Sequence, residues 1–529
     1  MDFLEIFILI FFVFFTGYFP GRLITKFLPL KKQEKVVLSF AISFFLFYIL
    51  GFLSYIFNVN FAIFNGFFLL LFLILSIPYL VLKDFDFEES KLLRNFLITF
   101  LIFVIYQFFI PLYFGGLFSW DWFEHYLRSI FFLDRLPKNI VFEGYIIPSR
   151  PPFFNIVCFF YLSIIGGEFY KYQIISTFLN YNLVLVVYLF CKEYLKLENK
   201  KLFLIISIIM FLNPAISRQI TYTWTKAFCA FYIILGLYFY LKFLNYQDNL
   251  SLLFSSFLFG ISFIIHFSAG CYIVPVFLHL TYKTFLNRNL IKKSFLFYLI
   301  FLFTIFTYFS WAIKNYGIYK AFLSTNIYQQ QKSLNLTGRI GKDIYNFFKT
   351  LYPFPVKYYI YIFRNCGSFF KIFNHLHSVY LCTLPASLTF SLTIFLLFFF
   401  FKNYKKFTFF NFWIFFFFLS YFLGIVVMPV KELSGLAHTG LLPIISLIIC
   451  FGIKHIFSLN KKNFLILSCF YIIETLFIQI IFLTAYNVYS SPQSIISFAQ
   501  QGKIDSSLVS NFLLKYYNQL LFLFDKIFY

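Results

Sequence analysis

Long apolar runs alternate with short basic segments along almost the whole chain. A helix of about 20 mainly apolar residues crosses the hydrocarbon of a bilayer. The pattern therefore predicts an all-α, polytopic transmembrane helix bundle with about 14 spans. The first run lacks a basic start and a small-residue cleavage site, so we expect it to remain as a helix. The expected spans are 3–19, 36–57, 61–82, 96–114, 170–191, 202–217, 227–244, 252–268, 270–286, 294–314, 379–401, 408–428, 440–457 and 464–487.

The basic segments predict how these spans are oriented. Loops rich in Lys and Arg favour the cytoplasmic side of a membrane. The spans above place all of the basic loops on that side and both termini on the other. The apolar run Phe153–Ile165 is too short to span, and counting it as a crossing would reverse the loop 192–201. We expect it to form a hydrophobic helix in the outer leaflet, covered by protein. The basic loops are 22–35, 83–94, 192–201, 242–248, 283–293, 402–406 and 454–462.

The spans divide the chain into five parts. Three helices precede the part that carries the candidate site residues. A later, long segment without a span could cap the site from outside and help to select the acceptor. The last residues mix apolar clusters with Lys, Asp and Gln, which favours an interfacial amphipathic helix. The parts are an extension at 1–95, a core at 96–315 with an outer loop at 115–169, the cap at 316–378, further spans at 379–487 and the tail at 488–529.

Composition agrees with a membrane protein and excludes other classes. The 529 residues are 61% hydrophobic and only 12% charged, which no soluble core of this length requires. The net charge of +23 lies mostly in short loops, where it sets topology, so we expect no nucleic-acid partner. The eight Cys residues show no CxxC pair and no metal-ligand spacing, so we predict neither a disulfide framework nor a zinc site.

An acidic cluster follows the predicted span 96–114. On a helix, Asp121, Glu124 and His125 would share one face, an arrangement that suits a general base beside a hydrogen-bonding partner. The alternative is an interfacial helix with hydrated charges, in which Trp120 and Trp122 belong to an aromatic belt.

About 25 residues after the acidic cluster, a basic residue stands before two prolines. In Arg150-Pro151-Pro152, the prolines suit the start of a helix. The arginine has an alternative interpretation as a side chain that only reaches toward water.

Further polar residues fall on the same non-cytoplasmic side. Residues distant in sequence would therefore converge on one face, where ionisable groups near bilayer depth usually mark function or pairing. Two of these residues also have simpler interpretations. Lys226 could serve only to anchor a helix end, and His266 could be hydrogen-bonded locally. The additional candidates are Lys226, His266, Lys431, Glu432 and His438, and Arg218 lies on this side too.

Taken in order, these features resemble the GT-C superfold, which includes protein O-mannosyltransferases and lipid A aminoarabinose transferases. The resemblance covers roughly residues 95–315 and is one of pattern. In those families the first outer loop carries an Asp at the reaction centre, which Asp121 matches, and a basic residue before Pro-Pro contacts the lipid phosphate, which Arg150 matches. Those families commonly have two adjacent acids, whereas Asp121 and Glu124 are three apart, so the role of Glu124 is open.

The resemblance implies a membrane glycosyltransferase that uses a polyprenyl-phosphate-linked sugar donor. The acceptor would be a glycan, a lipid or a protein on the non-cytoplasmic side of the inner or plasma membrane. Asp121 and Glu124 are the expected catalytic residues, and Asp121 would act as the base in an inverting transfer. Some relatives use a divalent cation such as Mg²⁺ or Mn²⁺, but two acids are too few ligands to predict one. The expected substrate-binding residues are His125, Arg150, Lys226, His266, Lys431, Glu432 and His438.

Two other functions stay open. A lipid or sugar transporter should show internal repeats, broken helix pairs at matching places and charges at mid-membrane. The sequence has no clear repeat, and its charges gather at one face. A polysaccharide polymerase or ligase would share the lipid-linked donor but should carry its polar centre in a large late loop, whereas the cluster at Asp121 is early.

Overall fold

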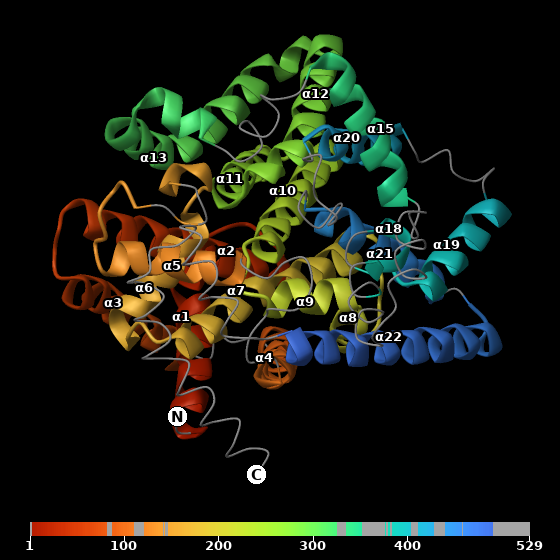
Figure 1. The fold of residues 1–529 in the computed structure, drawn as a ribbon, viewed down its shortest axis with the longest axis horizontal. Helices are drawn as coiled ribbons and strands as arrows, with labels where there is room; N and C mark the ends of the chain where they lie inside the picture. The colour runs from red at the N-terminus through yellow and green to blue at the C-terminus, as the bar shows by residue number, and fades with distance from the viewer. Residues whose placement is uncertain are drawn as a thin grey trace.

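The regular structure is almost entirely helical in the described part of the chain (Figure 1). The computed structural model describes residues 3–81, 87–109, 121–140, 142, 146–324, 335–351, 376, 379–380, 383–403, 411–427, 440–457 and 459–489. The helices are α1 Phe3–Thr25, α2 Lys32–Ile56, α3 Phe61–Val81, α4 Phe87–Phe108, α5 Asp121–Leu133, α6 Phe153–Ile165, α7 Phe169–Leu189, α8 Leu202–Leu212, α9 Pro214–Thr221, α10 Lys226–Tyr246, α11 Asn249–Ile265, α12 Gly270–Leu286, α13 Ile291–Leu323, α15 Leu336–Leu351, α18 Leu384–Ser387, α19 Phe390–Asn403, α20 Asn411–Val427, α21 Leu442–Ile456 and α22 Lys461–Tyr489. Short helical turns at Ile147–Ser149 (η2) and Phe267–Ala269 (η4) also matter for the site.

Each predicted span overlaps a helix, so the chain is an all-α integral membrane protein. Among the described residues, seven helices are long and apolar enough to cross a membrane, or eight if the bent pair α8 and α9 is one span. The remaining predicted spans correspond to helices that are shorter or less apolar. Length and composition therefore support about half of the predicted crossings directly.

Three ion pairs tie together segments that the sequence places on the cytoplasmic side. They join the end of α1 to α4, the start of α2 to α10, and the loop before α2 to the helical segment Phe190–Tyr194 that follows α7. The pairs are Arg22 with Glu89 at 2.8 Å, Lys242 with Glu34 at 2.8 Å, and Lys31 with Glu193 at 2.5 Å. Four of the predicted cytoplasmic loops thus meet at one end of the bundle, which we call the basic end.

The opposite end carries a second polar layer. On α10, Lys226 and Lys242 are 16 residues apart, which corresponds to about 24 Å at the helical rise. On α1, Glu5 pairs with Lys171 of α7 at 3.3 Å and stands about 25 Å along the helix from Arg22. These separations approach the roughly 30 Å of bilayer hydrocarbon, so the two polar layers suit its two faces.

The core lies around α7 and α10, which are almost wholly buried and pack against each other. Figure 1 shows α10 and α11 side by side through the middle of the molecule, with α22 along one edge. The short hydrophobic helix predicted at Phe153–Ile165 is confirmed as α6, and other helices cover its first ten residues. Helix α2 packs along it, with Phe47 stacked on Phe160 at 4.5 Å and Tyr48 on Phe153 at 4.6 Å between ring centroids.

Candidate functional site

Glu124 stands between two arginines at the end of the bundle opposite the basic end. Its Oε1 accepts from Nε of Arg128 at 2.6 Å, one helical turn along α5. Its Oε2 lies 3.1 Å from Nη2 of Arg150. The side chains of Glu124 and Arg128 are only 2% exposed, so each charge depends on its partners for compensation. We call Glu124, Arg128 and Arg150 the Glu124 cluster.

Arg128 fixes the segment that carries Arg150. Its Nη1 donates to the carbonyl of Ile147 at 2.9 Å and its Nη2 to the hydroxyl of Ser149 at 3.2 Å, so α5 holds the turn η2 in place. Burial lowers the pKa of Arg128, and the charge of Glu124 opposes that shift. A guanidinium stays protonated in proteins, so the cluster keeps its positive charge.

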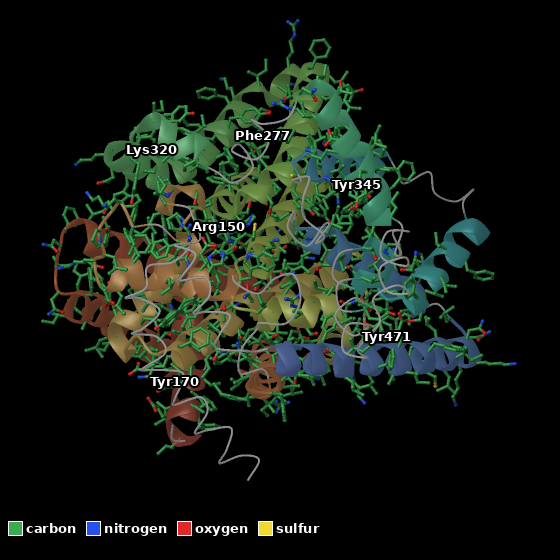
Figure 2. The ribbon with its side chains drawn as sticks, viewed as in Figure 1. Arg150, Tyr170, Phe277, Lys320, Tyr345 and Tyr471 are labelled. Atoms are coloured by element: carbon green, nitrogen blue, oxygen red, sulfur yellow. The ribbon has the colours of Figure 1, made fainter. Side chains whose placement is uncertain are left out.

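Arg150 lies between η2 and α6. Its backbone is extended, with φ −134° and ψ 128°, as expected for a residue before proline. Pro151 and Pro152 follow, and α6 begins at Phe153, so the sequence-based prediction of a helix start here is confirmed. The Arg150 side chain is 19% exposed and, in Figure 2, lies near the middle of the molecule.

His125 is tied to α6 by a residue that the sequence did not single out. The amide of Asn155 donates to the backbone carbonyl of His125 at 2.7 Å, and its Nδ2 lies 3.4 Å from the Nδ1 of that ring. The hydroxyl of Ser129 donates to the same carbonyl at 3.1 Å. All three side chains are buried. Asn155 therefore sets the position of α5 against the start of α6.

The predicted span 202–217 is wrong as a single straight helix. It breaks at Asn213 into α8 and α9, which meet at 89°. Pro214 lacks an N–H group and disfavours a continued helix through Asn213. The Asn213 side chain accepts from the N–H of Ile216 at 3.0 Å, which caps α9, and donates to the carbonyl of Ser387 at 2.9 Å.

Buried amide side chains satisfy the backbone around this break. Gln107 donates to the carbonyl of Thr221 at 2.9 Å, and Asn180 donates to that of Trp224 at 2.8 Å. Gln479 donates to the hydroxyl of Ser217 at 2.8 Å and to the carbonyl of Phe211 at 3.1 Å. Backbone that is not helical is tolerated at such depth only when it is covered and bonded in this way. The turn between α9 and α10 is thus held rigidly.

This turn presents two cations against aromatic rings. The Lys226 ammonium lies 3.6 Å from the ring centroid of Trp224, and the Arg218 guanidinium lies 4.9 Å from that of Tyr222. Both cations are 3% exposed. A cation over an aromatic face is stabilised electrostatically, more so when desolvated. We call Arg218, Tyr222, Trp224 and Lys226 the α9–α10 corner.

The Glu124 cluster and the α9–α10 corner are neighbours. Tyr172 of α7 donates to the carbonyl of Thr223 within the turn at 3.3 Å, and its ring lies 5.3 Å from that of Tyr126 on α5. Phe154 at the start of α6 lies 5.8 Å from Phe228 at the start of α10. The first turns of α5, α6 and α10, which carry or adjoin Glu124, Arg150 and Lys226, therefore surround one region.

The remaining candidates have separate outcomes. His266 caps the turn η4 locally, because its Nδ1 accepts from the N–H of Ser268 at 3.1 Å and lies 2.7 Å from the Ser268 hydroxyl. Gly440, which precedes α21, lies beside this turn, and Tyr272 donates to its carbonyl at 2.7 Å. Asp121 is the first residue of α5. The side chain of Asp121, together with Trp120, Lys431, Glu432 and His438, lies outside the described residues.

The charged side chains described in the Glu124 cluster and the α9–α10 corner are mostly cationic. The two groups comprise one carboxylate, Glu124, and four cationic side chains, and the N-termini of α6 and α10 add their positive dipole ends. Such an arrangement suits an anionic group. Within the described side chains, no three His, Cys, Asp or Glu residues come together closely enough to hold a metal ion.

Comparison with known proteins identifies no family. No protein-family model and no curated protein matches the chain. Among solved structures, the crystal structure of ArnT from Cupriavidus metallidurans bound to undecaprenyl phosphate is similar over 76% of this chain and 79% of that one, with 11% identity and a TM-score of 0.42. A likeness this distant carries no argument about activity, which has to come from the site.

Proposed function

We propose that this protein is a membrane glycosyltransferase of the GT-C type. It transfers a sugar from a polyprenyl-phosphate-linked donor to an acceptor on the non-cytoplasmic side of the membrane. The observation that carries the proposal is the gathering of four cationic side chains, Arg128, Arg150, Arg218 and Lys226, around the first turns of α5, α6 and α10, at the end of the bundle away from the basic end. A donor phosphate is the anionic group that a membrane-embedded site of this kind would bind.

Arg150 is the residue that we assign to the donor phosphate. It stands at the start of α6, is partly exposed, and is aligned by Glu124, while Arg128 anchors the turn before it. Lys226 supplies a second positive charge from the α9–α10 corner. Phosphate is a good leaving group when cations stabilise the developing charge, so little acid catalysis is needed at the donor.

Asp121 is the residue that we assign as general base. It is the first residue of α5 and stands three positions before Glu124. It would take the proton of the acceptor hydroxyl as that oxygen attacks the anomeric carbon from the face opposite the phosphate, which inverts the configuration. Glu124 serves as a positioning residue, because its two oxygens already engage Arg128 and Arg150.

The proposal is tested by transfer assays with purified protein in nanodiscs and a panel of polyprenyl-phosphate sugars. The wild type should release polyprenyl phosphate from one of them. Asp121→Asn should lower turnover by a factor on the order of 10²–10⁴, the usual contribution of general acid–base catalysis. Asp134→Asn, which changes an exposed acid just after α5, is the matched control and should retain activity. Equal turnover by the wild type and Asp121→Asn would contradict the assignment.

A further inference from the structure

Helix α15 has its polar and apolar faces reversed relative to a helix on a water-exposed surface. Its inward stripe is polar, and its outward stripe is apolar. Lys342, Asn346 and Thr350, spaced four residues apart, are 5%, 0% and 0% exposed. Ile340, Ile344 and Phe348, spaced in the same way on the other side, are 52%, 54% and 63% exposed. A helix beside water normally shows the opposite arrangement.

The polar stripe packs on α20. The ammonium of Lys342 donates to the carbonyl of Val426 at 2.7 Å, near the C-terminus of α20, where a cation is favourable. Further along, the hydroxyl of Tyr421 donates to the carbonyl of Phe347 at 3.3 Å. As residue numbers rise along α15 they fall along α20, so the two helices are antiparallel.

This geometry carries α15 along the body of α20. The contacts move from Val426 to Tyr421, five residues or about 7.5 Å along the axis of α20. Helix α20 lies within the predicted span 408–428. Its own outward residues Phe418 and Phe422 are 66% and 48% exposed, so they continue the apolar surface of α15. In Figure 2, Tyr345 of α15 and Arg150 lie on opposite sides of α10.

We propose that α15 lies in the membrane beside α20, with Ile340, Ile344 and Phe348 against lipid acyl chains. The occupant of this face is the bilayer, because its apolar surface is continuous with that of a predicted span and the polar stripe Lys342, Asn346 and Thr350 is turned into protein, as hydrocarbon requires. With 16 residues, or about 24 Å, α15 is too short to span comfortably and dips into the bilayer from one face.

This placement replaces the sequence-based expectation for the part of 316–378 that α15 occupies. That expectation had the segment covering the site from the aqueous side. The inference does not depend on the proposed enzymatic function, because it uses only the contacts and exposure of α15 and α20. Lipid contact can therefore be established or refuted whatever the activity of the protein.

A photoreactive phenylalanine, p-benzoylphenylalanine, tests the inference when it is introduced at single positions of the full-length protein in its native membrane. Phe348 on α15 and Phe418 on α20 are a matched pair, at 63% and 66% exposure. Phe27, which is 83% exposed in the predicted cytoplasmic loop 22–35, is the control for an aqueous position. After irradiation, purified protein is measured by intact mass spectrometry.

The expected result is a mass increase of one phospholipid for the probes at Phe348 and Phe418, with little lipid adduct at Phe27. Once the probe at Phe418 gives lipid adducts, each other outcome at Phe348 overturns the inference. A cross-linked species at twice the mass of the protein would mean that a second copy of the chain covers this face. A cross-link within the chain would mean that the protein itself covers it. Absence of any adduct would place α15 in water.

Discussion

The two ends of the bundle use buried charge differently. At the basic end, three carboxylates meet three cations in ion pairs that join α1, α2, α4, α7 and α10. At the site end, Glu124 faces two arginines, and two further cations lie against aromatic rings. A balanced buried pair holds helices together, whereas an excess of one sign creates a field for a charged ligand. We therefore expect the first end to serve architecture, and we propose that the second serves binding.

The largest expected effect comes from removing the carboxylate charge at each end. Glu124→Gln leaves Arg128 buried without its ion pair, and Glu34→Gln does the same to Lys242. Each should cost about 3–5 kcal/mol of stability, as when one partner of a buried pair is lost. Only Glu124→Gln should also weaken binding of undecaprenyl phosphate, because Arg150 loses its alignment. Thermal unfolding and binding of undecaprenyl phosphate, measured on the same samples, would distinguish the two ends. Equal losses of binding in the two variants would contradict the separate roles of the ends.

A second comparison uses two lysines on one helix. Lys226→Met removes a cation from the site and should lower affinity for undecaprenyl phosphate by about 10-fold or more, the value of a charge-assisted hydrogen bond. Lys242→Met leaves Glu34 buried without a counter-charge, so it should lower the unfolding temperature and leave affinity unchanged. Affinity is measured by titration and stability by thermal unfolding. If Lys242→Met lowered the affinity and Lys226→Met did not, the binding end would have been assigned wrongly.

Asn155→Ala should have a smaller effect. It removes the hydrogen bond from α6 to the carbonyl of His125, which we expect to cost about 1–2 kcal/mol of stability. Because it shifts α5 against Arg150, KM for the donor should rise more than kcat falls. A fall in kcat alone would contradict this positioning role. Asn182→Ala is the matched control, because that buried amide donates only within α7, to the carbonyl of Phe178.

The smallest effect is expected at the exposed margin of the basic end. Lys31 is 54% exposed, and its hydrogen bond to Glu193 raises its pKa. A raised lysine pKa contributes stability at neutral pH that is lost only as pH rises through the folded-state value. Lys31→Ala should therefore cost less than about 1 kcal/mol, with no change between pH 6 and 8. A strong dependence of the mutant effect on pH in that range would show that Lys31 has another role.

The apolar pattern predicted the positions of the helices because each run must hide its backbone in hydrocarbon. It also predicted α6 at Phe153–Ile165, and the loops that meet at the basic end. The break at Asn213 was missed although Pro214 was a visible signal. Arg128 was missed too, although it stands four residues after Glu124 on the same helical face.

Other features of the site had no signal in the sequence. The contact of Asn155 with His125 joins positions 30 residues apart, and that of Gln479 with Ser217 joins positions 262 apart. Polar residues inside apolar runs indicated that partners must exist, but not which ones. The four-residue spacing of Lys342, Asn346 and Thr350 is visible in the sequence. The sequence does not say which stripe of the helix faces the protein, because that depends on the packing against α20.

The central claim is that the site end binds a lipid phosphate through Arg150. The most direct test is binding of undecaprenyl phosphate to purified protein in nanodiscs, with the wild type, Arg150→Ala and, as matched control, the exposed Arg288→Ala. We predict saturable binding that Arg150→Ala weakens by roughly 10- to 100-fold and that Arg288→Ala leaves unchanged. Absence of binding to folded wild-type protein, or equal binding by Arg150→Ala, would contradict the claim.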